Sequence, residues 1–220
     1  YGIAGMVDST QRSARISNTV RYDSLNWSGF HFGASYSLGG NTKNPEGGMV
    51  GVVDNGADND GYAISLGYDN GPLALVGNWS RLADSDKSSV WNLGAAYKFG
   101  PARVSLAYQY TKDKGWKLGY EQDASTQKDW LLGLEWTLGP GRLNASVQNL
   151  RVKSEQAFGN SDSKKAWKYG IGYTYNLSKR TSLYGNVAYT NYDDEAMGKF
   201  YGANDRDSVT GVQVGITHKF

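Results

Sequence analysis

Residues able to carry out covalent chemistry are few in this chain of 220 residues. It has no cysteine and only two histidines, His31 and His218. Without cysteine there is no thiol nucleophile and no thiolate metal site, and no Gly-x-Ser-x-Gly motif supplies an activated serine. The acidic stretch 54–61 departs from a calcium loop, because Gly67 stands where the final glutamate is needed. We therefore expect no metal and no cofactor, and an enzyme is a remote alternative.

Charged and polar side chains recur instead at every second position, where they alternate with apolar residues. On the wall of a narrow pore, such fixed charges act on ions at close range and set ion selectivity. The predicted wall residues are Arg15, Ser17, Thr19, Arg21, His31, Lys98, Arg103, Glu135, Arg142, Lys168 and Lys219, with Asp69 as a further acid. Because cations outnumber acids in this set, we expect a weak preference for anions.

The composition indicates strands and turns. The chain has 16 Tyr, 7 Trp and 29 Gly but only 4 Pro, and aromatic and glycine residues are typical of sheets and their connections. The formal net charge is +2, and the basic residues are scattered, so no nucleic-acid partner is expected. The mean hydropathy of -0.56 does not exclude a membrane, because a barrel strand turns only one face to lipid.

Eleven segments alternate between apolar and polar residues. If they are strands, the alternation places these charged side chains on one face of a sheet. Each has roughly 10–13 residues, the length that a tilted strand needs to cross a bilayer and about twice that of a soluble strand. The predicted strands are 13–23, 27–39, 61–70, 72–82, 89–99, 102–112, 128–138, 142–153, 165–176, 182–192 and 208–220. They predict an all-β fold, a transmembrane antiparallel β-barrel forming one domain over residues 1–220.

The aromatic residues indicate which face of these strands meets the lipid. Trp130 and Trp136 lie near the two ends of one apolar face, and Trp167 and Tyr175 near those of another. Interfacial girdles of aromatic residues have this placement in membrane barrels. The apolar face is therefore expected to point outward and the polar face to enclose water.

The connections between the strands alternate in length. Short ones at 24–26, 71–72, 100–101, 139–141 and 177–181 separate longer ones at 40–60, 113–127, 154–164 and 193–207, whereas 83–88 is of modest length. Short periplasmic turns and long extracellular loops produce this asymmetry in outer-membrane barrels. A soluble β-sandwich, the alternative that also alternates, has no reason to sort its loops in this way.

The number of predicted strands also carries a prediction. Bacterial single-chain barrels have even strand numbers, so eleven strands predict that an odd number precedes the first one. A complete small barrel of twelve strands, serving as a solute-specific channel, is the alternative.

Three stretches resemble a known family. Residues 12–24 (RSARISNTVRYDS) with 27–30 (WSGF) resemble the segment after the constriction loop of general Gram-negative porins of the neisserial and β-proteobacterial type. Residues 175–184 (YNLSKRTSLY) resemble the last periplasmic turn of these porins, and 212–220 (VQVGITHKF) their terminal strand. The likeness extends over essentially the whole chain.

The resemblance implies a homotrimer of roughly sixteen-stranded barrels in the bacterial outer membrane, among lipid and lipopolysaccharide. Small hydrophilic solutes and ions would diffuse through it passively. The chain would contain about strands 6–16, so five strands would precede it. Arg15 and Arg21 would belong to the basic ladder that faces the constriction loop.

The resemblance also assigns a role to the end of the chain. Phe220 would be the terminal residue that the outer-membrane assembly machinery reads, with Ile216 and Val214 behind it. His218 stands two residues from the end, where an apolar or aromatic side chain is common, and this weakens the signal slightly.

Overall fold

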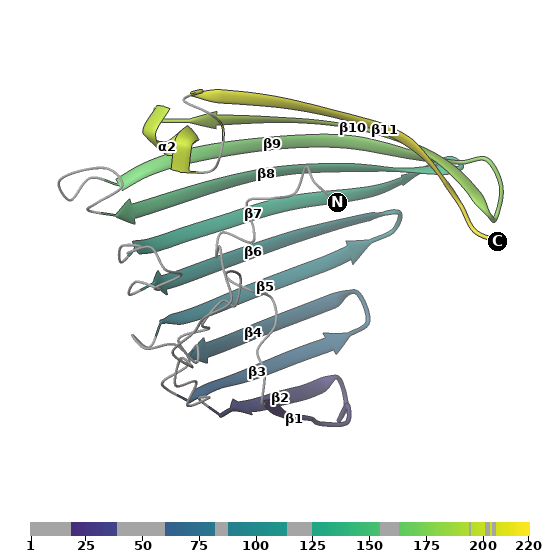
Figure 1. Cartoon of the computed structure of the whole chain (residues 1–220). Helices are drawn as coiled ribbons and strands as arrows, with labels where there is room; N and C mark the ends of the chain where they lie inside the picture. The colour runs from purple at the N-terminus through teal and green to yellow at the C-terminus, as the bar shows by residue number, and fades with distance from the viewer. Residues whose placement is uncertain are drawn as a thin grey trace, which may run out of the picture.

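The computed structural model describes residues 19–38, 60–81, 88–113, 125–154, 163–193, 195–200, 203 and 206–220. They form one antiparallel sheet of eleven strands, and each strand pairs with its neighbour in sequence. Figure 1 shows the strands following one another from β1 to β11 across the sheet, with the short turns gathered at one end. The predicted all-β class and antiparallel arrangement are confirmed.

The strands lengthen toward the middle and C-terminal part of the sheet. Their bounds are β1 Thr19–Asp23, β2 Phe30–Ser37, β3 Gly61–Asn70, β4 Leu73–Arg81, β5 Ser89–Phe99, β6 Ala102–Asp113, β7 Ser125–Leu138, β8 Gly141–Ser154, β9 Ser163–Asn176, β10 Thr181–Tyr192 and β11 Ser208–His218. β7 and β9 begin earlier than their alternation predicted, because the pairing of β7, β8 and β9 continues past the apolar band. The predicted first strand lies partly outside the described residues.

Three of the turns have the same sequence and a similar backbone conformation. Gly71, Gly100 and Gly139 each have a φ between 56° and 57°, and each is followed by proline. A residue with positive φ at the first turn position is the requirement of a type II′ hairpin, whose twist matches that of the strands. These Gly-Pro pairs therefore fix the register of three hairpins at the rim with the short turns, which we call the turn rim.

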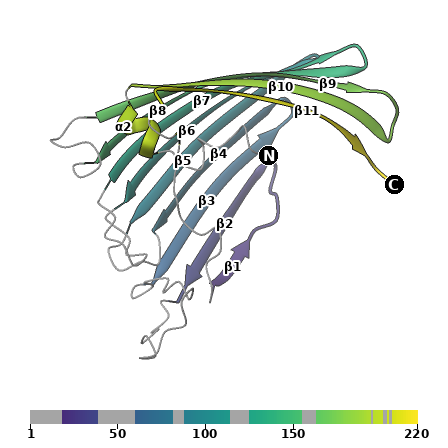
Figure 2. The same cartoon turned by 45° about the horizontal axis from the view of Figure 1, so that its top comes forward.

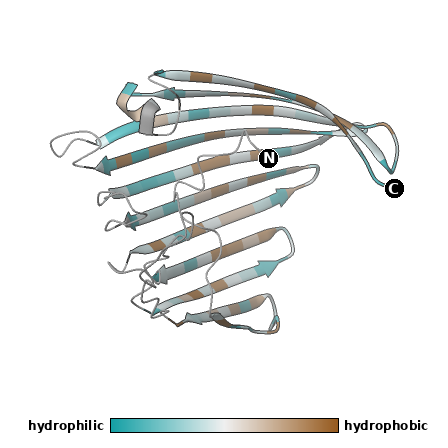
Figure 3. Ribbon diagram, viewed as in Figure 1, coloured by the Kyte–Doolittle hydropathy of each residue, from teal (hydrophilic) through white to brown (hydrophobic). Residues whose placement is uncertain are grey.

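The two faces of the sheet differ as the alternation predicted. The apolar face carries Leu66, Leu106, Leu132, Ile171 and Val212, which are all exposed. The polar face carries charged and amide side chains at the alternate positions, among them Arg103, Asn144 and Lys168. Brown and teal patches alternate along the strands in Figure 3, and Figure 2 shows the sheet curving from β1 to β11.

The sheet is open along two edges. β1 pairs only with β2, and β11 only with β10, so the backbone groups on the outer edge of β11 have no partner strand among the described residues. Long unpaired edges are sites of unwanted strand addition, and barrel closure removes them.

A short helix follows β10, within a connection that the sequence predicted only as a long loop. α2, Glu195–Phe200, contacts β9 and β10 at the opposite rim, which we call the loop rim (Figure 1). Met197 is fully buried there. No helix in the described part of the chain is long and apolar enough to span a membrane.

The packing of α2 reverses the expected polarity at one place. Met197 packs in a cluster with Leu150, Val152, Ala166 and Tyr192. These strand residues share parity and register with Lys168 and Gln148, so the cluster lies on the polar face. The polar face is therefore hydrophilic only up to about Gln148 on β8, and dry beneath α2 at the loop rim.

Candidate functional site: the polar face of the sheet

A row of charges crosses the polar face near the turn rim. Lys98 of β5 lies opposite Arg103 of β6, which lies opposite Glu135 of β7. Glu135 Oε2 is 3.4 Å from Arg142 Nη1 of β8, with both side chains about half exposed. Within the described residues neither Lys98 nor Arg103 forms an ion pair, so this row carries uncompensated positive charge.

The β1–β3 part of the face is closer to neutral. Nε and Nη2 of Arg21 donate hydrogen bonds of 2.8–3.0 Å to the carboxylate of Asp23. Nδ1 of His31 lies 3.8 Å from Asp69 Oδ2. Thr19 Oγ1 is 2.8 Å from Ser37 Oγ. The sequence prediction overlooked Asp23, although its position two residues after Arg21 places it on the same face.

Arg15 and Ser17 lie outside the described residues, so their place on the wall stays a prediction, as does the constriction role of Arg15 and Arg21. Lys219 follows β11, and its backbone N–H donates to the carbonyl of Arg180. It is exposed at the open edge of the sheet.

Two glycines on this face lie under neighbouring side chains. A Cβ at Gly67 would be 2.1 Å from Nε2 of His31, its cross-strand partner. A Cβ at Gly172 would be 2.0 Å from Oδ1 of Asn186. Glycine here lets the imidazole and the amide lie flat against the wall, where a larger residue would push them away from it.

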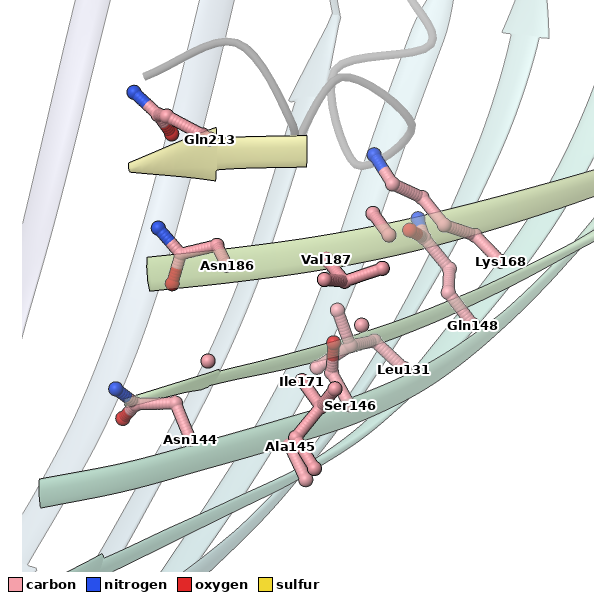
Figure 4. A pocket seen from close by; sticks show the side chains of 13 residues that line it. Leu131, Asn144, Ala145, Ser146, Gln148, Lys168, Ile171, Asn186, Val187 and Gln213 are labelled. Atoms are coloured by element: carbon pink, nitrogen blue, oxygen red, sulfur yellow. The ribbon is translucent and has the colours of Figure 1, made fainter. Parts of the chain in front are cut away.

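A row of carboxamides lies farther along the wall. Asn144, Gly172, Asn186 and Gln213 follow one another in register across β8 to β11. Figure 4 shows the three amide side chains one above another, with Gln148 and Lys168 beside them. They line a shallow hollow of about 290 Å³. Amides offer donors and acceptors without net charge, so they can exchange hydrogen bonds with water and hydrophilic solutes.

The sequence prediction also overlooked the carboxylate of Asp129. Nε2 of Gln148 donates a 2.8 Å hydrogen bond to Asp129 Oδ2, and both residues are buried on the polar face. Gln148 lies opposite Lys168 on β9. Parity alone would have placed Asp129 on the polar face, opposite Gln109 of β6.

α2 should depend on one side chain for its docking. We expect Met197→Ala to release the helix from Leu150 and Val152, because Met197 is the residue of α2 in the buried cluster and truncation of a buried Met commonly costs about 2–5 kcal/mol. The expected result is faster proteolytic cleavage within residues 193–207, measured with the protein folded in detergent. The free energy of global unfolding should change little. Glu195→Ala, an exposed position on the same helix, is the control. Equal cleavage of the wild type and Met197→Ala would contradict this docking role.

The apolar face carries aromatic side chains at both ends of its band. Toward the loop rim, Trp91 lies 5.2 Å from Tyr108, and Trp130 lies 5.5 Å from Trp167 between ring centroids. Toward the turn rim, Tyr97 and Phe99 stack at 6.0 Å. Eight residues separate Trp167 from Tyr175 on β9, which is about 27 Å along the strand, or about 21 Å of thickness at a tilt of about 40°. This height is close to that of the apolar band of a membrane barrel.

The end of the chain continues this face. Val214, Ile216 and Phe220 are all strongly exposed. Nδ1 of His218 is 2.9 Å from Thr181 Oγ1, and its ring contacts that of Phe220 at 5.0 Å. The assembly role of Val214, Ile216 and Phe220 stays a prediction.

Groups with catalytic or metal-binding potential are dispersed in the described part of the chain. His31 lies on β2 and His218 at the end of β11, nine strands away in the sheet order. No group of three or more His, Asp or Glu residues among the described residues could hold a metal ion. Most of the stretch 54–61 lies outside those residues.

Sequence comparisons place the chain among known proteins. A sequence profile of a family described as "Gram-negative porin" matches residues 1–195. The outer membrane porin protein 32 of Delftia acidovorans is 31% identical over 94% of this chain and 57% of its own length. An outer membrane porin protein of Bordetella pertussis is 29% identical over 98% of this chain and 60% of its own length. The chain thus spans about three fifths of the length of these relatives.

The fold has matching solved structures. An anion-selective porin from Comamonas acidovorans superimposes with a TM-score of 0.64 and 26% sequence identity, over 93% of this chain and 60% of that protein. Salmonella typhi OmpF superimposes with a TM-score of 0.66 over 92% of this chain and 62% of that protein, at 15% identity. The latter likeness concerns the fold alone.

Proposed function

Since this chain belongs to the Gram-negative porin family, we propose that it forms part of the wall of an outer-membrane channel through which ions and small hydrophilic solutes diffuse passively. The observation that carries this proposal is the separation of faces. The exposed Leu, Ile and Val residues and the aromatic girdles share one face. The charged row of Lys98, Arg103 and Glu135 and the carboxamides of Asn144, Asn186 and Gln213 share the other, and they are suited to a water-filled lumen.

The proposal includes closure of the sheet. In hydrocarbon every backbone donor and acceptor needs a partner, which a barrel without edges provides. Eleven strands in one open sheet would then be an arc of a wider barrel, about strands 6–16 of sixteen. A barrel of that size leaves an aqueous channel, whereas one of about eight strands fills with side chains.

We further propose a weak preference for anions. The support is the row formed by Lys98 and Arg103, together with Lys168 farther along the wall. Asp23, Asp69 and Glu135 offset part of this charge, so the preference is expected to be mild. The relative from Comamonas is named as anion-selective, in line with this direction.

The experiment is electrical recording from the natural full-length protein in planar phosphatidylcholine bilayers. We expect ohmic channels that need no energy source, with a reversal potential of the anion-selective sign in a salt gradient. Conductance rising in groups of three steps would support the homotrimer. Absence of conductance from folded, inserted protein would contradict the channel proposal, and a cation-selective sign would contradict the selectivity alone.

The proposed partners follow from the proposed position in the outer membrane. Lipid and lipopolysaccharide would surround the apolar face, and small hydrophilic solutes and ions would contact the polar face. We propose no catalytic activity, because passive diffusion requires no bond to be made or broken.

A further inference from the structure

Five basic side chains gather on the apolar face where it leaves its aromatic band at the loop rim. Lys128 of β7 lies opposite Arg151 of β8, which lies opposite Lys165 of β9. One step farther toward the loops, Lys112 of β6 and Lys153 of β8 both lie opposite Thr126 of β7. We call Lys112, Lys128, Arg151, Lys153 and Lys165 the basic patch.

The strand parity and exposure show that the basic patch faces away from the lumen wall. Lys128, Arg151 and Lys153 are exposed, whereas Gln127, Leu150 and Val152 between them are buried on the polar face. Lys112 is also exposed and Lys165 is partly so. These cations are therefore separated from the proposed pore by the sheet itself.

The basic patch lies directly beyond the aromatic girdle. Trp130 and Trp167 occupy the apolar face two residues after Lys128 and Lys165 on their strands, toward the turn rim. Tyr110 stands in the same relation to Lys112, two residues nearer the turn rim. Tryptophan and tyrosine gather at the level of the membrane interface, so the basic patch lies at or just outside the level of the lipid headgroups.

Little charge in the described part of the chain compensates the basic patch. Within the described residues none of its five side chains forms an ion pair. The nearby carboxylate of Asp193 accepts a hydrogen bond from the backbone N–H of Lys165 at 2.8 Å. By contrast Arg81, an outward cation of β4, donates to the hydroxyl of Tyr62 at 3.0 Å and lies over its ring. Arg81 is thus engaged by the protein, while the basic patch is available to a ligand.

We propose that the basic patch is a binding site for the phosphorylated sugar headgroup of lipopolysaccharide in the outer leaflet. Lys and Arg bind phosphate oxygens through charge-assisted hydrogen bonds, and clustered cations at a membrane surface recruit anionic lipid. The patch spans β6 to β9, which is about 14 Å at the usual strand spacing. A surface of this breadth can engage phosphates at both ends of one lipid A headgroup while the acyl chains lie along Leu132, Val147 and Ile171.

Lipopolysaccharide is proposed as the ligand because the basic patch lies at the loop rim. The basic patch is at the loop rim, the side that faces the cell exterior in barrels of this kind, where lipopolysaccharide forms the leaflet. This inference rests on the proposed outer-membrane position, and it adds the site and the chemistry of one lipid partner.

The test compares lipid binding by matched variants of the full-length protein purified without lipopolysaccharide. Lys128→Gln/Arg151→Gln/Lys153→Gln removes three charges from the basic patch. Lys98→Gln/Arg103→Gln/Lys168→Gln removes three from the polar face and is the control. Binding of diphosphorylated lipid A, dephosphorylated lipid A and phosphatidylglycerol is titrated in detergent by native mass spectrometry.

We expect lipid A binding to weaken by roughly a hundredfold in the patch variant and by less than about twofold in the control. Wild-type binding should fall with added salt and with loss of the lipid's phosphates. Unchanged binding by the patch variant, or equal binding of dephosphorylated lipid A or phosphatidylglycerol, would overturn the proposal. Conductance in phosphatidylcholine bilayers is recorded on the same preparations. A patch variant that conducts normally shows that it has folded, whereas a wild type that does not conduct would count against the proposed function instead.

Discussion

Replacing Ile171 by lysine is expected to destabilise the folded protein in a bilayer by about 2–4 kcal/mol, the cost of a Lys near the bilayer midplane on the lipid face of a barrel. Ile171 is 56% exposed and lies midway between Trp167 and Tyr175 on β9, with Ala145 and Val187 as cross-strand partners. Its side chain is therefore placed at the centre of the apolar band. The measurement is the free energy of unfolding in phosphatidylcholine liposomes by denaturant titration.

The matched control is Ser146→Lys. Ser146 is exposed on the polar face of the neighbouring strand, opposite Gly170, and a lysine there would extend into water. We expect a change of less than about 1 kcal/mol. If Ser146→Lys proved as destabilising as Ile171→Lys, or if Ile171→Lys had no effect, the assignment of the apolar face to lipid would be wrong.

Reversing the charge of Lys98 and Arg103 to glutamate is expected to turn the anion preference into a cation preference. The double variant changes the wall charge by four units at one row. For an ion about 10 Å away, each unit contributes ~0.4 kcal/mol in water before screening. Screening at 0.1 M salt reduces the sum to about 0.6 kcal/mol, which is roughly threefold in local concentration for each sign of ion. The sign of the reversal potential in a salt gradient measures this change.

The control for charge alone is Lys128→Glu/Arg151→Glu. It makes the same four-unit change on the opposite face of the sheet, so the reversal potential in lipopolysaccharide-free bilayers should keep its sign. A reversal by both variants would show that selectivity depends on overall charge. No reversal by Lys98→Glu/Arg103→Glu would show that this row lies away from the ion path.

Much of this fold follows from local patterns in the sequence. Period-two alternation between Ala102 and Lys112 is enough to place Arg103 and Tyr108 on opposite faces, because successive side chains of a strand point to opposite sides. The Gly-Pro pairs at the turns fix where strands reverse. Antiparallel pairing between sequential neighbours then brings Lys98, Arg103 and Glu135 into one row, since short hairpins leave little freedom of register.

What the sequence left open depends on contacts between distant segments. The docking of α2 requires contact between Met197 and two residues of β8, Leu150 and Val152. Alternation alone places these two residues on the polar face, where they would be expected to meet water. The burial of Asp129 beside Gln148 of the neighbouring strand likewise depends on packing between strands. The pairing of Arg21 with Asp23 follows instead from a spacing of two residues, which the sequence prediction overlooked.

The sequence by itself therefore determined the strands, their order and the two-faced character of the sheet, because these follow from backbone geometry and periodicity within each hairpin. Only the tertiary structure decided where, toward the loop rim, the polar face becomes buried and the apolar face becomes charged. There the polar face turns dry beneath α2 and the apolar face gains the basic patch. The reason is physical: burial and charge density are properties of surfaces assembled from several strands, and no single strand carries them.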